Sequence, residues 1–262
     1  MIDKSAREAA AAALDEARTT ATPIEPPTET WPGFDVDDAY AVQALGIDRR
    51  LAAGAAIVGW KVGLTSEAMQ RQLGVDEPDF GPLLDRMEVS ADATVERSGL
   101  ISPRIEAELA FRLRAELGGP GIDVAAVAAA VDTVLPALEL IDSRVVDWRI
   151  QLADTIADHA SCSGFVLGGE VPLSAVDLGA VAVAVSRNGE QVEEGIGKAV
   201  LGDPLAAVAW VANTIAAYGE TLLPGQVILA GALHASIPLA AGDRIEASFS
   251  DPAIGSLTVR CH

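Results

Sequence analysis

The sequence predicts an α+β fold, because helical patterns come first along the chain and strand patterns dominate the remainder. Two helical patterns fall within the first 55 residues. After them, short apolar segments rich in β-branched and small residues recur, as expected of a mixed or antiparallel sheet. No linker-like stretch interrupts this part of the chain. We therefore expect a helical N-terminal region, residues 1–55, and one β-rich domain, residues 56–262.

The chain is expected to begin with a helix and an extended connector. The helix covers residues 2–20, with Asp3 or Ser5 as its N-cap. The segment 22–34 holds four prolines. Proline has a fixed φ and no amide proton, so this segment is predicted to be extended throughout.

Two further helices are predicted from their caps and their apolar spacing. Asp35 caps the second helix, whose apolar residues keep helical spacing up to Gly54. A third, long helix starts at Asp203, with Pro204 in its first position, and ends at Gly219. Proline suits the first turn because its missing amide proton would have no partner there.

The predicted strands follow the second helix. Asn188-Gly189 indicates a two-residue hairpin that returns over residues 190–194, since both residues readily adopt positive φ. The expected strands are 57–64, 106–113, 133–141, 163–168, 181–187, 227–231, 243–249 and 256–261.

Charge and composition exclude several classes of partner. With 18 basic and 38 acidic residues, the formal net charge is −20, so no basic stripe can neutralise phosphates or attract the chain to an anionic membrane. The longest apolar run, near residues 205–212, is under half of the roughly 18–20 residues that a membrane span needs. Cys162 and Cys261 cannot form a disulfide framework. We expect no nucleic-acid partner, no membrane association and a cytoplasmic location.

Glu139 is a charged residue inside the apolar segment VLPALELI. A continuous apolar strand is usually buried on both faces, where an unpaired carboxylate is costly. Glu139 is then protonated, paired or bound to a metal. The alternative is a strand end at which Glu139 reaches solvent beside Asp142 and Arg144, and this segment alone does not separate the two.

Glu106 and Glu108 alternate with apolar residues in IEAELAF. The two-residue period of a strand places both carboxylates on one face. Their repulsion would be relieved by a hard cation, which takes oxygen ligands. Taken alone, the pattern favours the simpler interpretation, in which both glutamates face water.

Lys61 interrupts the apolar run AAIVGWKVGL between Gly59 and Gly63. Glycines at these positions indicate a close approach to the backbone. Lys61 either extends to the surface along its methylenes or lies in a site beside anionic groups. The segment alone favours the surface position.

Seven segments occur in a fixed order along the chain. They are GWKVGLTS (59–66), PDFGPLLD (78–85), SPRIEAELAF (102–111), ALELIDSR (137–144), ASCSGFVLG (160–168), LGDPLAAVAWVAN (201–213) and LPGQVILAGAL (223–233). Together they resemble the 2-keto-4-pentenoate hydratase family, which includes 2-oxo-3-hexenedioate decarboxylases and belongs to the fumarylacetoacetate hydrolase superfamily. The resemblance covers roughly residues 35–260. Two residues depart from the commoner pattern: His159 stands where asparagine is usual, and Asp203 where histidine is usual.

The resemblance implies a fold and a set of site residues. The fold is a β-rich roll of mixed sheets with peripheral helices, which makes 56–262 the catalytic domain, generally in a homo-oligomer. Lys61 and Asp79 match the family's acid/base groups, and Ser161 is expected to contact the substrate. The ligands of one divalent cation, Mg²⁺ or Mn²⁺, match Glu106, Glu108 and Glu139.

The implied function is a metal-dependent hydratase, a hydro-lyase of meta-cleavage degradation of aromatic or steroid compounds. It adds water to a 2-hydroxy-2,4-dienoate and forms a 4-hydroxy-2-oxo acid, so its partner is a small anionic 2-oxo acid. One alternative is decarboxylation of 2-oxo-3-hexenedioate. Another is a non-catalytic partner subunit, although costly charges in apolar strands argue against a subunit without a site.

Overall fold

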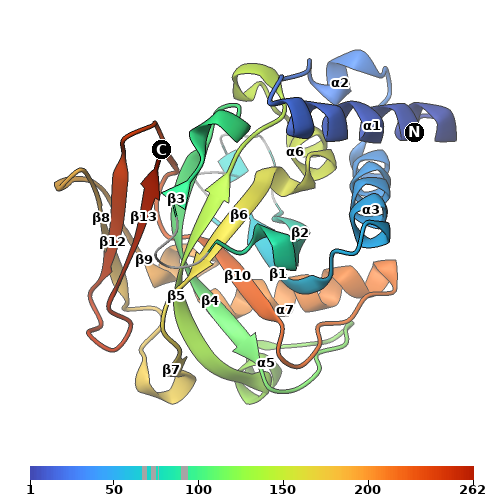
Figure 1. The fold of residues 1–262 in the computed structure, drawn as a ribbon. Coiled ribbons are helices and arrows are strands. Elements are labelled where there is room, and N and C mark those ends of the chain that lie inside the picture. Colours follow the sequence, from blue (N-terminus) through green and yellow to red (C-terminus); the bar gives the residue numbers. More distant parts are fainter. Residues whose placement is uncertain (67–69, 72–74, 76, 90–93) are drawn as a thin grey trace.

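The computed structural model describes residues 1–66, 70–71, 75, 77–89 and 94–262. Figure 1 shows a curled central sheet with a smaller sheet on one side and the N-terminal helices on the other. This arrangement confirms the predicted α+β class with peripheral helices. The division into a 1–55 region and a 56–262 domain stays a prediction.

The larger sheet is built around two long antiparallel strands, β4 (Arg104–Leu113) and β5 (Val131–Ile141). Its other strands are β1 (Ile57–Gly63), β2 (Asp79–Leu84), β6 (Cys162–Leu167), β7 (Val171–Pro172), β10 (Val227–Ala232) and β11 (Ile237–Pro238). The order is β2-β1-β10-β4-β5-β6, with β11 paired to β4 and β7 paired to β5. Because β1 and β10 are parallel while β1 and β2 are antiparallel, the sheet is mixed.

The smaller sheet follows the order β3-β13-β12-β8-β9. Asn188 and Gly189 have φ of 54° and 88° between β8 and β9, which confirms the predicted hairpin. The strands are β3 (Thr94–Val95), β8 (Ala182–Arg187), β9 (Glu190–Ile196), β12 (Arg244–Phe249) and β13 (Ser256–Cys261).

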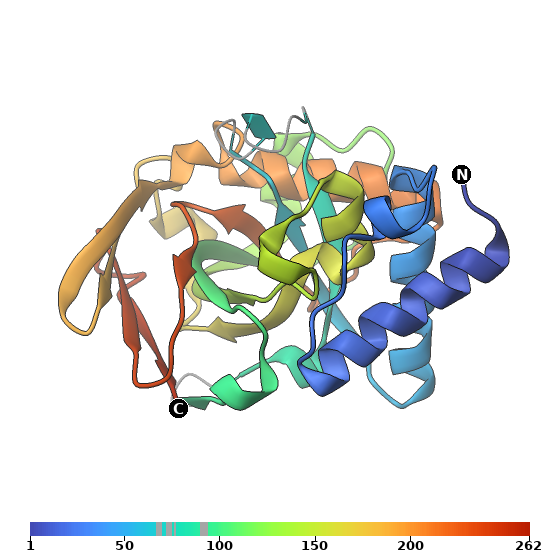
Figure 2. The same ribbon diagram turned by 90° about the horizontal axis from the view of Figure 1, so that it is seen from above.

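Helices surround the larger sheet. Figure 2 shows the first three grouped at the end of the molecule that holds the N-terminus. The α-helices are α1 (Lys4–Thr20), α2 (Pro27–Thr30), α3 (Val36–Ala52), α5 (Val124–Ala130), α6 (Leu152–Ala157) and α7 (Pro204–Ile215). The 3₁₀ turns are η1 (Asp85–Met87), η2 (Arg97–Gly99), η3 (Val146–Trp148), η4 (His159–Ser161), η5 (Leu173–Ala175), η6 (Gly197–Ala199) and η7 (Ala216–Tyr218).

The caps of the first helices agree with the sequence, but the connector between them does not. Asp3 accepts a hydrogen bond from an amide of α1, and Asp35 forms a capping box with Asp38 at α3. The prediction of a connector that is extended throughout is wrong, because α2 lies within it. Two effects favour this short helix. Proline is preorganised for a first helical turn. In addition, the buried Asp154 side chain accepts hydrogen bonds from the amide and hydroxyl of Thr28.

The elements that the sequence did not reveal include β2, α5 and α6. The β2 segment carries Gly81 and Pro82, which both depress strand propensity. It forms a strand because it lies at the edge of the sheet, where a missing amide proton is tolerated. Strand β2 brings Asp79 opposite Gly63.

The helical segment Gly197–Tyr218 has the length and apolarity of a membrane span. Half of it is buried in the protein, where α7 packs against β10 and β1, so it has the pattern of a core helix. Leu201 and Gly202 have positive φ and interrupt the helix ahead of α7. Asp203, where the sequence departs from the commoner family pattern, caps α7 by accepting a hydrogen bond from the Leu205 amide.

Gly59 allows β1 and β10 to approach each other. A Cβ at Gly59 would lie 1.9 Å from the carbonyl oxygen of Val227, a contact that no side chain tolerates. This confirms the close approach predicted from the glycines beside Lys61.

We expect Gly59→Ala to lower the free energy of unfolding by about 1–3 kcal/mol, because the methyl group must push the two strands apart. Gly99→Ala is the matched control, since a Cβ at Gly99 has nothing within 4 Å. Urea unfolding followed by circular dichroism measures both variants. Equal midpoints for the two variants would contradict the close packing of these strands.

Candidate active site

Three carboxylates meet on the paired strands β4 and β5. The register places Glu106 directly opposite Glu139, and Glu108 lies two residues further along β4 on the same face. One oxygen from each side chain lies within 4.8 Å of the others. Glu108 and Glu139 are fully buried and Glu106 is partly exposed. The water-facing alternative for the two β4 glutamates and the solvent-exposed alternative for Glu139 are therefore wrong.

The cluster is electrostatically unbalanced. Burial and then the charge of Glu139 raise the pKa of Glu106 to about 7, and the same two causes raise the pKa of Glu108 well above its usual range. The Gly231 amide donates to Glu108 Oε2 at 2.8 Å, but the other oxygen of Glu108 and both oxygens of Glu139 are buried without a hydrogen bond. Buried carboxylate oxygens without donors fit a hard divalent cation, which is bound by oxygen ligands.

Lys61 lies beside this cluster and not at the surface, so the surface interpretation is wrong. Its Nζ is 3.4 Å from Glu139 Oε1 and donates to the carbonyl oxygen of Ala160 at 2.9 Å. Burial disfavours the charged ammonium, but the negative charges of Glu139 and Asp79 outweigh burial, so the pKa of Lys61 is raised. Lys61 is therefore an ammonium held in the interior.

Asp79 faces Lys61 from β2. A Cβ at Gly63 would lie 2.1 Å from Asp79 Oδ1 and 2.9 Å from Lys61 Nζ, so glycine is required where the two groups converge. Burial raises the pKa of Asp79 even though Lys61 opposes the rise. Asp79 Oδ2 accepts a 3.5 Å hydrogen bond from Thr155, whose hydroxyl lies 3.2 Å from the Ser161 hydroxyl.

The turn η4 carries two of these contacts in an uncommon conformation. His159, Ala160 and Ser161 have φ of 59°, 49° and 56°, the left-handed region that side chains disfavour. Such residues cost about 1–3 kcal/mol each and concentrate at functional sites. The turn presents the Ala160 carbonyl to Lys61 and the Ser161 hydroxyl to Thr155.

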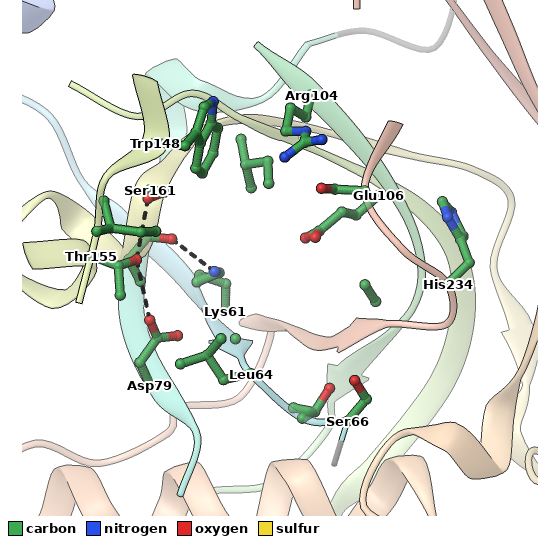
Figure 3. A pocket seen from close by; sticks show the side chains of 17 residues that line it. Lys61, Leu64, Ser66, Asp79, Arg104, Glu106, Trp148, Thr155, Ser161 and His234 are labelled. Carbon is green, nitrogen blue, oxygen red and sulfur yellow. Dashed lines mark hydrogen bonds between the residues drawn. The ribbon is translucent and has the colours of Figure 1, made fainter. Parts of the chain in front are cut away.

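All of the expected site residues line one pocket of about 150 Å³ or belong to the carboxylate cluster that reaches it through Glu106. Lys61, Asp79, Glu106 and Ser161 line the pocket, as Figure 3 shows. Glu108 and Glu139 complete the carboxylate cluster beside Glu106. Segments far apart in the sequence thus place an ammonium, a carboxyl group and a carboxylate cluster around one small space.

Among the pocket side chains that sequence reasoning missed are Arg104, Trp148 and Thr155. The Arg104 guanidinium lies 5.6 Å from the ring centroid of Trp148, and its buried Nε has no hydrogen-bond partner. Arg104 is two residues before Glu106, so the strand period could have placed both on one face. Trp148 lies in the 3₁₀ turn η3 and Thr155 in α6, two elements after β5 that no sequence pattern predicted.

The sequence profile described as fumarylacetoacetate (FAA) hydrolase C-terminal matches residues 70–261. A 2-keto-4-pentenoate hydratase of Paraburkholderia xenovorans (strain LB400) is 45% identical over 242 residues, covering 92% of this chain and 90% of the relative. A 2-hydroxyhexa-2,4-dienoate hydratase of Comamonas testosteroni is 43% identical over 249 residues, covering 94% of each chain. The relatives include a 4-oxalocrotonate decarboxylase of Pseudomonas sp. (strain CF600) at 42% identity.

The solved structures agree with the sequence relatives. A 4-oxalocrotonate decarboxylase from Pseudomonas putida G7, complexed with magnesium and adipate, superposes with a TM-score of 0.95 at 39% identity. The match covers 100% of this chain and 99% of that chain. This likeness confirms the predicted roll with its helical N-terminal part.

We expect Glu108→Gln to abolish stabilisation by Mg²⁺, because it removes one carboxylate of the cluster. At Mg²⁺ about 100-fold above its Kd, the wild-type Tm should rise by about 5–10 °C, measured by thermal unfolding with and without the cation. Without Mg²⁺, the variant should melt at or above the wild-type Tm, since one of three mutually repelling groups is neutralised.

The matched control is Glu116→Gln, a change of an exposed carboxylate outside the cluster. It should keep the full Mg²⁺ shift. The same shift in both variants would contradict a cation site at the cluster.

Proposed function

The chain belongs to the fumarylacetoacetate hydrolase family, and on that premise we propose that it is a hydro-lyase that adds water to a 2-hydroxy-2,4-dienoate. The product is a 4-hydroxy-2-oxo acid, formed in meta-cleavage degradation of aromatic or steroid compounds. The observation that carries the proposal is the carboxylate cluster beside a buried lysine, with Glu106 and Lys61 both lining one small pocket.

The cluster is assigned to one divalent cation, Mg²⁺ or Mn²⁺, with Glu106, Glu108 and Glu139 as its ligands. The buried oxygens of Glu108 and Glu139 that have no hydrogen bond support the assignment, as does the cation in the 39% identical magnesium complex. When bound, the cation supplies a Lewis acid that attracts the carboxylate and 2-oxo oxygens of the substrate and stabilises negative charge on the latter.

The reaction consists of two proton transfers to carbon and one addition of water. Protonation at C5 converts the 2-hydroxy-2,4-dienoate to an α,β-unsaturated 2-oxo acid, and the 2-hydroxyl proton is released. Water then adds at C4 and gives up one proton. Protonation at C3 completes the 4-hydroxy-2-oxo acid.

Lys61 is assigned to binding of the substrate oxygens or to proton transfer near them, and Asp79 to water activation or proton transfer. The Lys61 ammonium, held by Ala160 and Glu139, donates hydrogen bonds to the substrate oxygens as negative charge develops there. Asp79 has one buried oxygen without a hydrogen bond, and burial raises its pKa toward the range useful to a general acid or base. Ser161 contacts the substrate and, through Thr155, orients Asp79.

A 2-oxo-3-hexenedioate decarboxylase is the second candidate. The unpartnered guanidinium nitrogen of Arg104 in the pocket could receive a second carboxylate, and the magnesium and adipate complex is a decarboxylase. The hydratase is favoured because most relatives at 41–46% identity are hydratases. A non-catalytic partner subunit is disfavoured, since it would have no use for buried unbalanced charges.

A homo-oligomer and a cytoplasmic location belong to the same proposal. The family resemblance supports the first, which light scattering of the purified protein measures. The two cysteines, which form no disulfide framework, support the second. The expected partner is a small anionic 2-oxo acid.

We expect the purified protein with Mg²⁺ to hydrate 2-hydroxypenta-2,4-dienoate and to release little or no CO₂ from 2-oxo-3-hexenedioate. Loss of dienoate absorbance and formation of the 4-hydroxy-2-oxo acid measure the first reaction, and CO₂ capture measures the second. Release of CO₂ without hydration would contradict the hydratase assignment and support the decarboxylase. No reaction with either substrate would favour the partner subunit.

We expect Lys61→Met and Asp79→Asn to lower kcat by about 10²–10⁴-fold, because the first removes the ammonium that stabilises negative charge on the substrate oxygens and the second removes an acid or base group. Both variants should keep the Mg²⁺-dependent rise in Tm, since neither residue is a proposed ligand. Lys198→Met, a change of an exposed lysine, is the control and should keep wild-type kcat. A Lys61 or Asp79 variant that retained wild-type kcat would remove that residue from the mechanism.

A further inference from the structure

We propose that Arg50 and His159 are positioning residues that lock the left-handed turn η4 and thereby aim Lys61 into the pocket. The inference rests on the proposed function, in which Lys61 takes part in the reaction. Neither Arg50 nor His159 is among the described residues that line the pocket. Both line a separate small cavity between η4 and the helices α1 and α3.

The two side chains form a chain of two hydrogen bonds, and the donor of each bond is defined. Arg50 Nη1 on α3 lies 3.0 Å from His159 Nδ1. Guanidinium groups only donate hydrogen bonds, so Nδ1 accepts and the ring proton lies on Nε2. Nε2 is 2.6 Å from the carbonyl oxygen of Pro82 on β2, to which it donates. Both ring nitrogens are thus fixed between α3 and β2.

The packing around the His159 ring leaves it little freedom. His159 is buried, and its Cδ2 would lie 3.0 Å from a Cβ at Gly81, so the ring rests against a strand position without a side chain. Arg50 also donates from Nε to the Gly46 carbonyl at 3.2 Å. These contacts fix the imidazole, and with it the first residue of the left-handed turn.

Burial and the charges near His159 keep the ring neutral. Burial lowers the pKa of His159 well below its usual range, and the positive charges of Arg50, Arg144 and Lys61 act in the same direction. Asp158, the adjacent acidic group, is ion-paired with Arg144. Nδ1 therefore remains an acceptor for Arg50 throughout the neutral pH range.

The turn held in this way positions the reactive groups. Its Ala160 carbonyl accepts a hydrogen bond from Lys61, and its Ser161 carbonyl accepts one from the Asp142 amide at 2.9 Å. Three consecutive non-glycine residues at positive φ are disfavoured unless the surroundings hold them. Without the Arg50 contact, we expect the turn to relax and the Ala160 carbonyl to withdraw from Lys61.

The kinetic test compares Arg50→Met with Arg49→Met on the same helix. Arg49 pairs with Asp15 and takes no part in the contact with His159. We expect Arg50→Met to lower kcat on the dienoate by about tenfold to a hundredfold and to keep the Mg²⁺-dependent rise in Tm, while Arg49→Met keeps wild-type kcat. Equal kcat in the two variants would overturn the proposal.

A rescue experiment separates positioning from general support of the fold. Ala160→Gly should restore part of the kcat lost in Arg50→Met, because glycine adopts positive φ without strain and retains the carbonyl that Lys61 contacts. A double variant no more active than Arg50→Met would contradict the locking of the turn.

A third experiment needs no substrate and no variant, so it tests the positioning of His159 independently of the proposed function. In protein labelled with ¹⁵N-histidine, only 3 histidines give signals. We expect His159 to be the neutral Nε2–H tautomer at neutral pH and still at about pH 6.5, the usual histidine pKa. A wild-type His159 that becomes protonated near its usual pKa, or that carries its proton on Nδ1, would overturn the proposal.

Discussion

The fold is organised around the burial of like charges on one face of a two-stranded antiparallel pair. Glu106 and Glu139 are register partners across β4 and β5, and Glu108 follows on the same face. Burying an unpaired carboxylate is costly, and holding three carboxylates with oxygens within 4.8 Å of one another, two of them buried, adds their repulsion. A site of this kind persists only with compensating positive charge, of which Lys61 provides one part. The proposed cation provides the rest.

The surrounding structure brings compensating groups to this strand pair. Gly231 supplies an amide to Glu108, and Gly63 leaves space for Lys61 and Asp79 to converge. Strand β2, at the edge of the sheet, contributes Asp79, and turn η4 contributes the carbonyl that accepts from Lys61. The net charge of −20 describes the whole chain, whereas the site has its own balance of charges and can receive an anionic acid.

The features that could be predicted are those with a strong local signal. Glu139 was prominent because apolar residues flank it on both sides, and Lys61 because glycines flank it. The hairpin at Asn188-Gly189 followed from backbone preference alone. No single segment indicated that Glu139 lies beside Glu106 and Lys61. That association came from the resemblance of seven ordered segments to a family.

The features that could not be predicted depend on partners distant in the sequence. Helix α2 forms in a proline-rich connector because Asp154 accepts hydrogen bonds from Thr28, 126 residues away. The contact between Arg50 and His159 spans 109 residues. In both cases the local sequence is compatible with several conformations, and tertiary hydrogen bonds select one of them.

The most direct test of the account is anomalous diffraction from crystals grown with Mn²⁺. The account predicts one strong peak among the carboxylates of Glu106, Glu108 and Glu139, within about 2.0–2.4 Å of an oxygen of each. An ordered site without a peak, at a Mn²⁺ concentration that supports turnover, would contradict the central claim that these buried carboxylates bind a divalent cation.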